Sequence, residues 1–178
     1  QAHPAIAPAL RRIGAWTMRT GVLPGWTKLK DRAAGIGLTD VCLMINASDD
    51  ANARPFASAK IIADVCDAYR QAGIAPWLAT WARPSIAYMD RAADSIAAVA
   101  SLTSIAGVHV DAEEEWLRGS TGHRAAAERF RDRMAALELE WWVTGILSTD
   151  MAEEGQLVRL ASGGIVQCYS TRKAWIKW

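Results

Sequence analysis

Two carboxylates, Asp111 and Glu113, lie at the end of a short segment, 107–113, in which apolar and polar residues alternate (GVHVDAE). Side chains of a β-strand point alternately to its two faces, so this pattern predicts a strand with His109, Asp111 and Glu113 on one face. One of two carboxylates placed in this way could protonate a leaving group while the other stabilises developing positive charge. Cleavage of a glycosidic bond requires both functions.

Glu113 lies farthest along the predicted strand, and we predict that it is the general acid. Its pKa would have to be raised, by burial or by the neighbouring charge of Asp111, for it to stay protonated near neutral pH. The two acids are too close in sequence to be assumed to flank a sugar ring from opposite sides. A substrate-assisted route fits this spacing better: an N-acetyl carbonyl of the substrate attacks while Asp111 holds the acetamido N–H. Substrates would then contain 2-acetamido sugars.

The elements that position these acids are predicted from periodicity, in which strand-like and helix-like segments alternate along the chain. Strand-like segments are Arg12 to Met18, Val41 to Asn46, Ala75 to Trp81, Val108 to Glu113, Trp141 to Leu147 and Ile165 to Ser170. Helical patterns lie between them: a segment following Pro24-Gly25 through Ala34, Phe56 to Gln71, a helix capped by Ser85 that runs to about Val99, Gly122 to Leu139, and Glu153 to Ala161. The alternation is typical of βα units with a parallel sheet.

About six βα units in one domain covering residues 1–178 predict a compact or incomplete TIM-like (β/α) barrel, since a complete barrel usually needs about 200 residues or more. An open, doubly wound sheet is the alternative. In a barrel the carboxyl ends of the strands meet at one mouth, which would bring acids, amides and aromatic residues together there. We predict that the residues at this mouth that bind substrate are Asn46, Trp81, Gln167, His109 and Asp150.

The Asp-x-Glu at the end of the fourth predicted strand resembles the acid pair of the chitinase and muramidase barrels of the glycoside hydrolase superfamily. Gln167-Cys168-Tyr169, on the sixth predicted strand, looks like the Met-x-Tyr pattern of the chitinases with Gln in place of Met. The resemblance implies that Asp111 and Glu113 are the catalytic acids and that Tyr169 bonds the acetamido carbonyl. The chain differs from the chitinase signature at Ala106 and His109, where that signature has further aspartates.

The resemblance also suggests the substrate. Some muramidases carry an acid at the end of their first strand, and the segment Ile13 to Met18 has none. The small size of the domain is nevertheless closer to the lytic modules of bacteria and their phages than to multidomain chitinases. We therefore expect peptidoglycan to be favoured over chitin, with action outside the cell or on the cell wall.

Three other interpretations of the same residues are open. His109, Asp111 and Glu113, with an acid such as Asp150, could hold Mg²⁺ or Ca²⁺ in a phosphodiesterase-type barrel. A non-catalytic barrel could bind carbohydrate through the same acids and tryptophans. The acid pair could also belong to a salt-bridge network with Arg118 or Arg124.

Composition excludes several function classes. Twenty basic and nineteen acidic residues give a formal charge of +1 with no basic cluster, so nucleic acid is not an expected partner. No apolar run reaches the roughly 20 residues of a membrane helix. Cys42, Cys66 and Cys168 are far apart and lack metal-type spacing, so we expect free buried thiols. We predict a soluble monomer with a polysaccharide substrate, no resident metal and no cofactor.

Overall fold

The computed structural model describes residues 14–17, 26–113, 116, 121–145 and 155–166. Strands and helices alternate throughout these residues, as the periodicity predicts. The strands are β1 (Gly14–Thr17), β2 (Asp40–Met44), β3 (Ala75–Trp81), β4 (Gly107–Ala112), β5 (Trp141–Gly145) and β6 (Gly163–Val166). The helices are α1 (Trp26–Gly35), α2 (Ala59–Gln71), α3 (Ile86–Ala100), α4 (Thr121–Ala136) and α5 (Gly155–Leu160).

Local signals account for the positions of several helix ends. Ser85 caps α3 as predicted, because its hydroxyl accepts a hydrogen bond from the backbone N–H of Tyr88. Helix α2 begins at Ala59, later than expected, and Ser58 is its N-cap. The preceding residues are held elsewhere: the backbone N–H of Phe56 donates to the carbonyl of Ile45 over 2.7 Å. Phe56 therefore lies beside the end of β2 and is not part of the helix.

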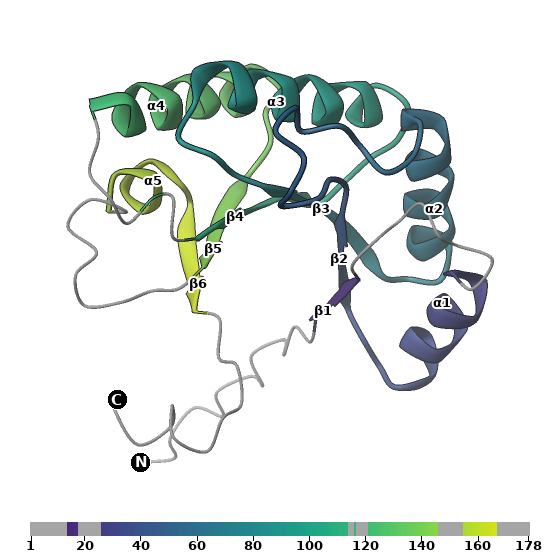
Figure 1. Ribbon diagram of the computed structural model, residues 1–178. Coiled ribbons are helices and arrows are strands. Elements are labelled where there is room, and N and C mark those ends of the chain that lie inside the picture. The colour runs from purple at the N-terminus through teal and green to yellow at the C-terminus, as the bar shows by residue number, and fades with distance from the viewer. Residues whose placement is uncertain (1–13, 18–25, 114–115, 117–120, 146–154, 167–178) are drawn as a thin grey trace, which may run out of the picture.

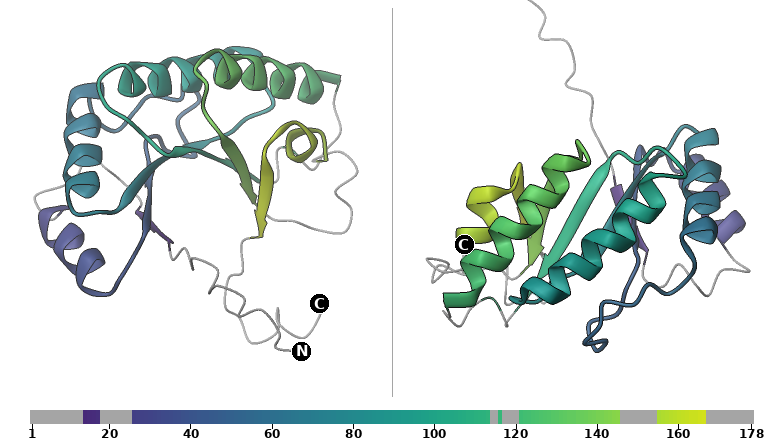
Figure 2. Two further views of the ribbon diagram at one scale, coloured as in Figure 1. Left: turned by 180° about the vertical axis from the view of Figure 1, so that it is seen from behind. Right: turned by 90° about the horizontal axis from the view of Figure 1, so that it is seen from above.

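The six strands form one parallel sheet in the order β1-β2-β3-β4-β5-β6. Figure 1 shows the sheet bent into an arch with the helices along its convex side, and the view from behind in Figure 2 shows the same arrangement. Each strand therefore pairs with the strand that follows it in the sequence. The chain between the two strands forms a helix on the convex side of the sheet. The prediction of an α/β fold with parallel strands is confirmed.

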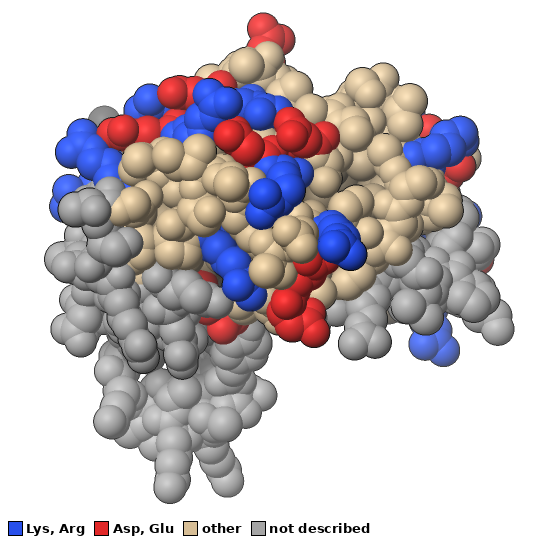
Figure 3. Space-filling model, turned by 45° about the horizontal axis from the view of Figure 1, so that its top comes forward, with Lys and Arg blue, Asp and Glu red and all other residues tan. Residues whose placement is uncertain are grey.

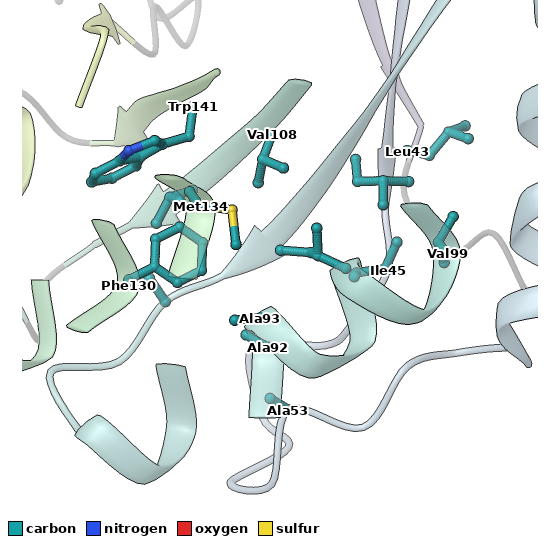
Figure 4. Close-up of a cluster of buried hydrophobic side chains, with 14 of the residues drawn as sticks. Leu43, Ile45, Ala53, Ala92, Ala93, Val99, Val108, Phe130, Met134 and Trp141 are labelled. Atoms are coloured by element: carbon teal, nitrogen blue, oxygen red, sulfur yellow. The ribbon is translucent and has the colours of Figure 1, made fainter. Parts of the chain in front are cut away.

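The main hydrophobic core lies between the sheet and the helices, and all five helices contribute to it. In β4 the alternate residues Val108, Val110 and Ala112 point into this core. Figure 4 shows how side chains of the strands meet those of α3 and α4, with the labelled residues Leu43, Ile45, Val108 and Trp141 on one side and Ala92, Ala93, Val99, Phe130 and Met134 on the other. Because side chains alternate along a strand, the residues between these core residues face away from the helices.

The concave face of the sheet carries a second, smaller cluster. Cys42, Met44, Trp77 and Ala79 are buried there, and Phe56 packs against them from the loop that follows β2. Large rings cover glycines of the next strand: a Cβ atom at Gly107 would lie 2.4 Å from Cζ3 of Trp77, and one at Gly163 would lie 2.5 Å from Cζ3 of Trp142. The glycines thus leave room for the tryptophans on this face.

The outer surface of α3 and α4 carries charges of both signs, visible as intermingled red and blue atoms in Figure 3. Arg129 and Arg133 of α4 pair with Asp90 of α3 at 2.8 and 3.3 Å, and Arg133 also pairs with Asp94. These ion pairs join neighbouring helices on the solvent side. In the described part of the chain, no helix has the length and apolar character needed to cross a membrane.

Candidate active site at the carboxyl end of β4

Asp111 lies near the carboxyl end of β4 on the face opposite the main core. Its register partners are Trp81 of β3 and Thr144 of β5, and its exposed fraction is 6%. Glu113 follows directly after the strand and is partly exposed. Since Val108, Val110 and Ala112 point to the helices, the alternation of the strand directs His109 and Asp111 to the concave face. This agrees with the predicted division of the strand into two faces.

The charge of Asp111 affects the thiol of Cys42, which lies on the same face of the sheet in β2. Burial, and secondarily the charge of Asp111, raises the pKa of the Cys42 thiol well above its ordinary value. The thiol is therefore protonated at neutral pH and a poor nucleophile. Cys42 and Cys66 are both free and buried, as expected, whereas Cys168 lies outside the described residues.

His109 precedes Asp111 by two residues and lies one row deeper on the same face, between Ala79 and Trp142 in register. Its ring contacts that of Trp77, with centroids 5.1 Å apart. Burial lowers the pKa of His109 to about 4, and the charge of Asp40 opposes this effect. His109 is therefore neutral at pH 7. Asp40 is itself held in place by the indole N–H of Trp77, which donates to Oδ1 over 2.9 Å.

Asn46 lies where β2 ends and is 2% exposed. Its Oδ1 accepts hydrogen bonds from the backbone N–H of Trp81 at 2.8 Å and from the hydroxyl of Thr80 at 3.3 Å. Its Nδ2 donates to the hydroxyl of Tyr88 over 3.2 Å. These bonds join the ends of β2 and β3 to helix α3, so Asn46 has a positioning role whether or not it also meets a substrate.

Trp81 is the neighbour of Asp111 on β3 and is partly buried. Its backbone is held by Asn46, and its ring packs beside the main core. The indole Nε1 has no hydrogen-bond partner among the described residues. Trp81 therefore lies beside Asp111 at the carboxyl end of β3, and its contact with a substrate stays a prediction.

The loop 47–57, between β2 and α2, is held beside these strand ends by hydrogen bonds to its backbone. Arg83 donates to the carbonyl of Ser48 over 2.7 Å, and Arg91 of α3 donates to the carbonyls of Ala51 and Asn52. Within the loop, the carboxylate of Asp50 accepts from two backbone N–H groups, those of Asn52 and Arg54. An aspartate in a polar segment is a recognisable turn signal, because its carboxylate can accept from the N–H two residues further on.

The structure thus brings together Asn46, Trp81, His109, Asp111 and Glu113 on three neighbouring strands. Gln167, Tyr169 and Asp150 lie outside the described residues, as does Arg118. Arg124, considered as a salt-bridge partner of the acids, pairs with Glu128 of its own helix at 2.8 Å. The described residues contain no group of three His, Cys, Asp or Glu side chains able to hold a metal ion.

Comparisons with protein-family models and with curated proteins found no match for this chain.

Proposed function

We propose that this protein is a glycoside hydrolase that cleaves N-acetylhexosamine-containing glycans, with peptidoglycan favoured over chitin. The observation that carries the proposal is that Asp111 lies at the carboxyl end of a central parallel strand, on the side facing away from the main core, with Glu113 directly after that strand. Parallel α/β folds hold their active sites at the carboxyl ends of the strands, so the position of Asp111 at such an end favours a functional role. We propose that the protein acts outside the cell or on the cell wall.

We further propose that the sheet is part of a compact TIM-like barrel. A doubly wound sheet reverses its strand order at a switch point, and the order of these six strands contains no reversal. Two tryptophans of the concave face, Trp77 of β3 and Trp142 of β5, cover glycines of β4 and β6. Large side chains thus fill the space inside the curve of the sheet, as they fill the interior of a barrel. The active sites of such barrels lie at the carboxyl ends of the strands.

In the proposed mechanism Glu113 donates its proton to the oxygen of the leaving sugar. The acetamido carbonyl of the substrate attacks the anomeric carbon as the leaving sugar departs, and Asp111 accepts a hydrogen bond from the acetamido N–H, which orients this group and stabilises the charge that develops on it. Water then adds to the anomeric carbon and opens the resulting ring, and the Glu113 carboxylate takes up the proton that the water loses. Neutral His109 adds no positive charge beneath Asp111 at pH 7. By the resemblance to the chitinases, Tyr169 would bond the acetamido carbonyl. The mechanism requires no metal and no cofactor.

The test is the release of soluble sugar from purified peptidoglycan and, separately, from chitin oligomers. We expect Glu113→Gln to lower the rate by at least about a hundredfold, because a glutamine cannot donate the required proton. Asp111→Asn should also lower the rate. Glu138→Gln is the matched control, since Glu138 is exposed and precedes the amino end of β5, whereas the proposed site lies at the carboxyl ends of the strands. Circular dichroism should show all three variants folded.

Three results would contradict the proposal. If the wild-type protein binds glycan without releasing sugar, and Glu113→Gln binds equally well, the protein is a carbohydrate-binding module. If EDTA abolishes activity, the metal-dependent interpretation replaces this one. If Glu113→Gln is as active as Glu138→Gln, the proton donor is another residue.

A further inference from the structure

Trp116 lies three residues after Glu113 and is completely buried, with an exposed fraction of 0%. Its side chain belongs to the main core between the sheet and the helices. The ring contacts that of His123 on α4, with centroids 5.5 Å apart. A residue so close to the end of β4 is therefore anchored in the interior by its side chain.

Hydrogen bonds connect Trp116 to both acids through the backbone. Its own N–H donates to the carbonyl of Glu113 over 2.9 Å, and its indole Nε1 donates to the carbonyl of Ala82 over 3.1 Å. The N–H of Ala82 in turn donates to the carbonyl of Asp111 over 2.9 Å. A continuous path of hydrogen bonds thus runs from Asp111 through Ala82 and Trp116 to Glu113.

These bonds resist displacement because they are buried. Ala82 and Trp116 are both 0% exposed. If the bond between the Trp116 indole and Ala82, or the bond between Ala82 and Asp111, were broken, no water could replace the lost partner. The indole N–H of a buried tryptophan normally has such a partner. The path therefore holds the backbone on both sides of Ala112, where the two acids are attached.

We propose that Trp116 is a positioning residue that fixes Glu113 relative to Asp111. The structural part of this inference stands on the hydrogen bonds alone, whereas its catalytic consequence rests on the proposed glycosidase function. Placement matters because a shift of about 1 Å in a catalytic group can lower a rate by roughly a hundredfold.

The test compares Trp116→Phe with Trp141→Phe. Phenylalanine at position 116 keeps an aromatic ring in the core but removes the indole donor. Trp141 is the matched control, because it is also a buried core tryptophan, 4% exposed, with its ring against that of Phe130 and no hydrogen bond to the acids in the described structure. Amide hydrogen exchange and the side-chain carboxyl ¹³C signal of Glu113, assigned with Glu113→Gln, are measured in each variant.

We expect Trp116→Phe to speed exchange of the amide at position 116 by about tenfold or more, relative to Trp141→Phe. The carboxyl signal of Glu113 should also move in Trp116→Phe and stay in place in Trp141→Phe. In the glycan assay, kcat should fall by about tenfold or more with KM unchanged, again only in Trp116→Phe. Equal behaviour of the two variants in exchange and carboxyl signal would overturn the inference.

The two proposals can fail separately. If the wild-type protein releases no sugar, the glycosidase proposal fails, and the exchange and carboxyl measurements still decide the positioning role. If exchange and the carboxyl signal change in Trp116→Phe while turnover matches that of Trp141→Phe, the catalytic part is overturned. If Trp116→Phe does not fold, hydrogen exchange of the Trp116 indole N–H is measured in the wild-type protein. Slow exchange supports the inference, and exchange as fast as in an exposed tryptophan overturns it.

Discussion

Asp111, in β4, and Glu113, directly after it, differ in how far they are enclosed by the protein. Asp111 is 6% exposed, whereas Glu113 is partly accessible to solvent. This difference suits the division of labour proposed above. An enclosed carboxylate can hold a substrate N–H without competition from water, and an acid nearer the surface can recover its proton after each turnover.

His109 makes folding stability depend on pH. Its pKa is about 4 in the folded protein and 6.5 in an ordinary environment, so between these values the unfolded chain binds more protons. The contribution of His109 is fully present above pH 6.5 and is lost as the pH falls towards 4. We expect this loss to be about 2 kcal/mol, allowing for the partial exposure of the ring.

Urea denaturation at pH 4.5 and pH 7 measures this effect. His109→Gln should lose less stability between the two pH values than the wild-type protein does, because glutamine does not titrate. Equal losses in the two proteins would show that burial does not hold the pKa of His109 down.

Asn46 provides a second prediction at this scale. Asn46→Ala would leave the buried N–H of Trp81 without its acceptor and the hydroxyl of Tyr88 without its donor. We expect the free energy of unfolding to fall by about 2–3 kcal/mol. Asn52→Ala, at an exposed position, should change it by less than about 0.5 kcal/mol. Similar values for the two variants in chemical denaturation would contradict the positioning role of Asn46.

Among the elements, the loop 47–57 stands out because side chains of several elements hold its backbone. Arg83 follows β3, Arg91 belongs to α3, and both donate to carbonyls of the loop. Asp50 supports it from inside, and Ala53 has a left-handed backbone conformation with φ of 53°. These hydrogen bonds keep the backbone of the loop in place beside the carboxyl ends of β2 and β3.

Removal of the internal support should loosen this loop without unfolding the protein. In Asp50→Ala the amides of Asn52 and Arg54 lose their acceptor, and we expect them to exchange with solvent about tenfold faster or more. Asp49→Ala is the matched control, since Asp49 is an exposed aspartate of the same loop. Unchanged exchange in Asp50→Ala would mean that the two arginines alone hold the loop.

For the molecule as a whole, the two faces of the sheet carry different kinds of side chain. Its convex face forms the main core with all five helices, and its concave face carries Asp111 and His109 among aromatic side chains. Substitutions on the convex face should therefore affect the whole fold. The single-domain prediction implies that the fold responds as one cooperative unit.

Leu78→Ala tests this prediction, because Leu78 is completely buried in β3. We expect it to lower the free energy of unfolding by about 2–5 kcal/mol, with one transition that coincides by tryptophan fluorescence and circular dichroism. Leu102→Ala, at a side chain that is 53% exposed, should have little effect. Two separate transitions would contradict the single domain.

Most of the elements could be predicted from the sequence because their signals are local. The bounds of β3 agree with the predicted Ala75 to Trp81, and Ser85 marks the start of α3. The alternation in β4 also showed which of its residues share a face with Asp111. Helix α2 was predicted to begin at Phe56, and this was wrong because the backbone N–H of Phe56 bonds the carbonyl of Ile45, just after β2.

The sequence by itself therefore determined the alternation of strands and helices and the face shared by His109 and Asp111. Only the tertiary structure decided which residues, far apart in the chain, hydrogen-bond to one another around Asp111. Trp116 meets Ala82, and Asn46 meets Tyr88, across 34 and 42 positions of the chain. Periodicity and capping act within a few residues, whereas such partners are chosen by the pairing of strands and the packing of helices on them.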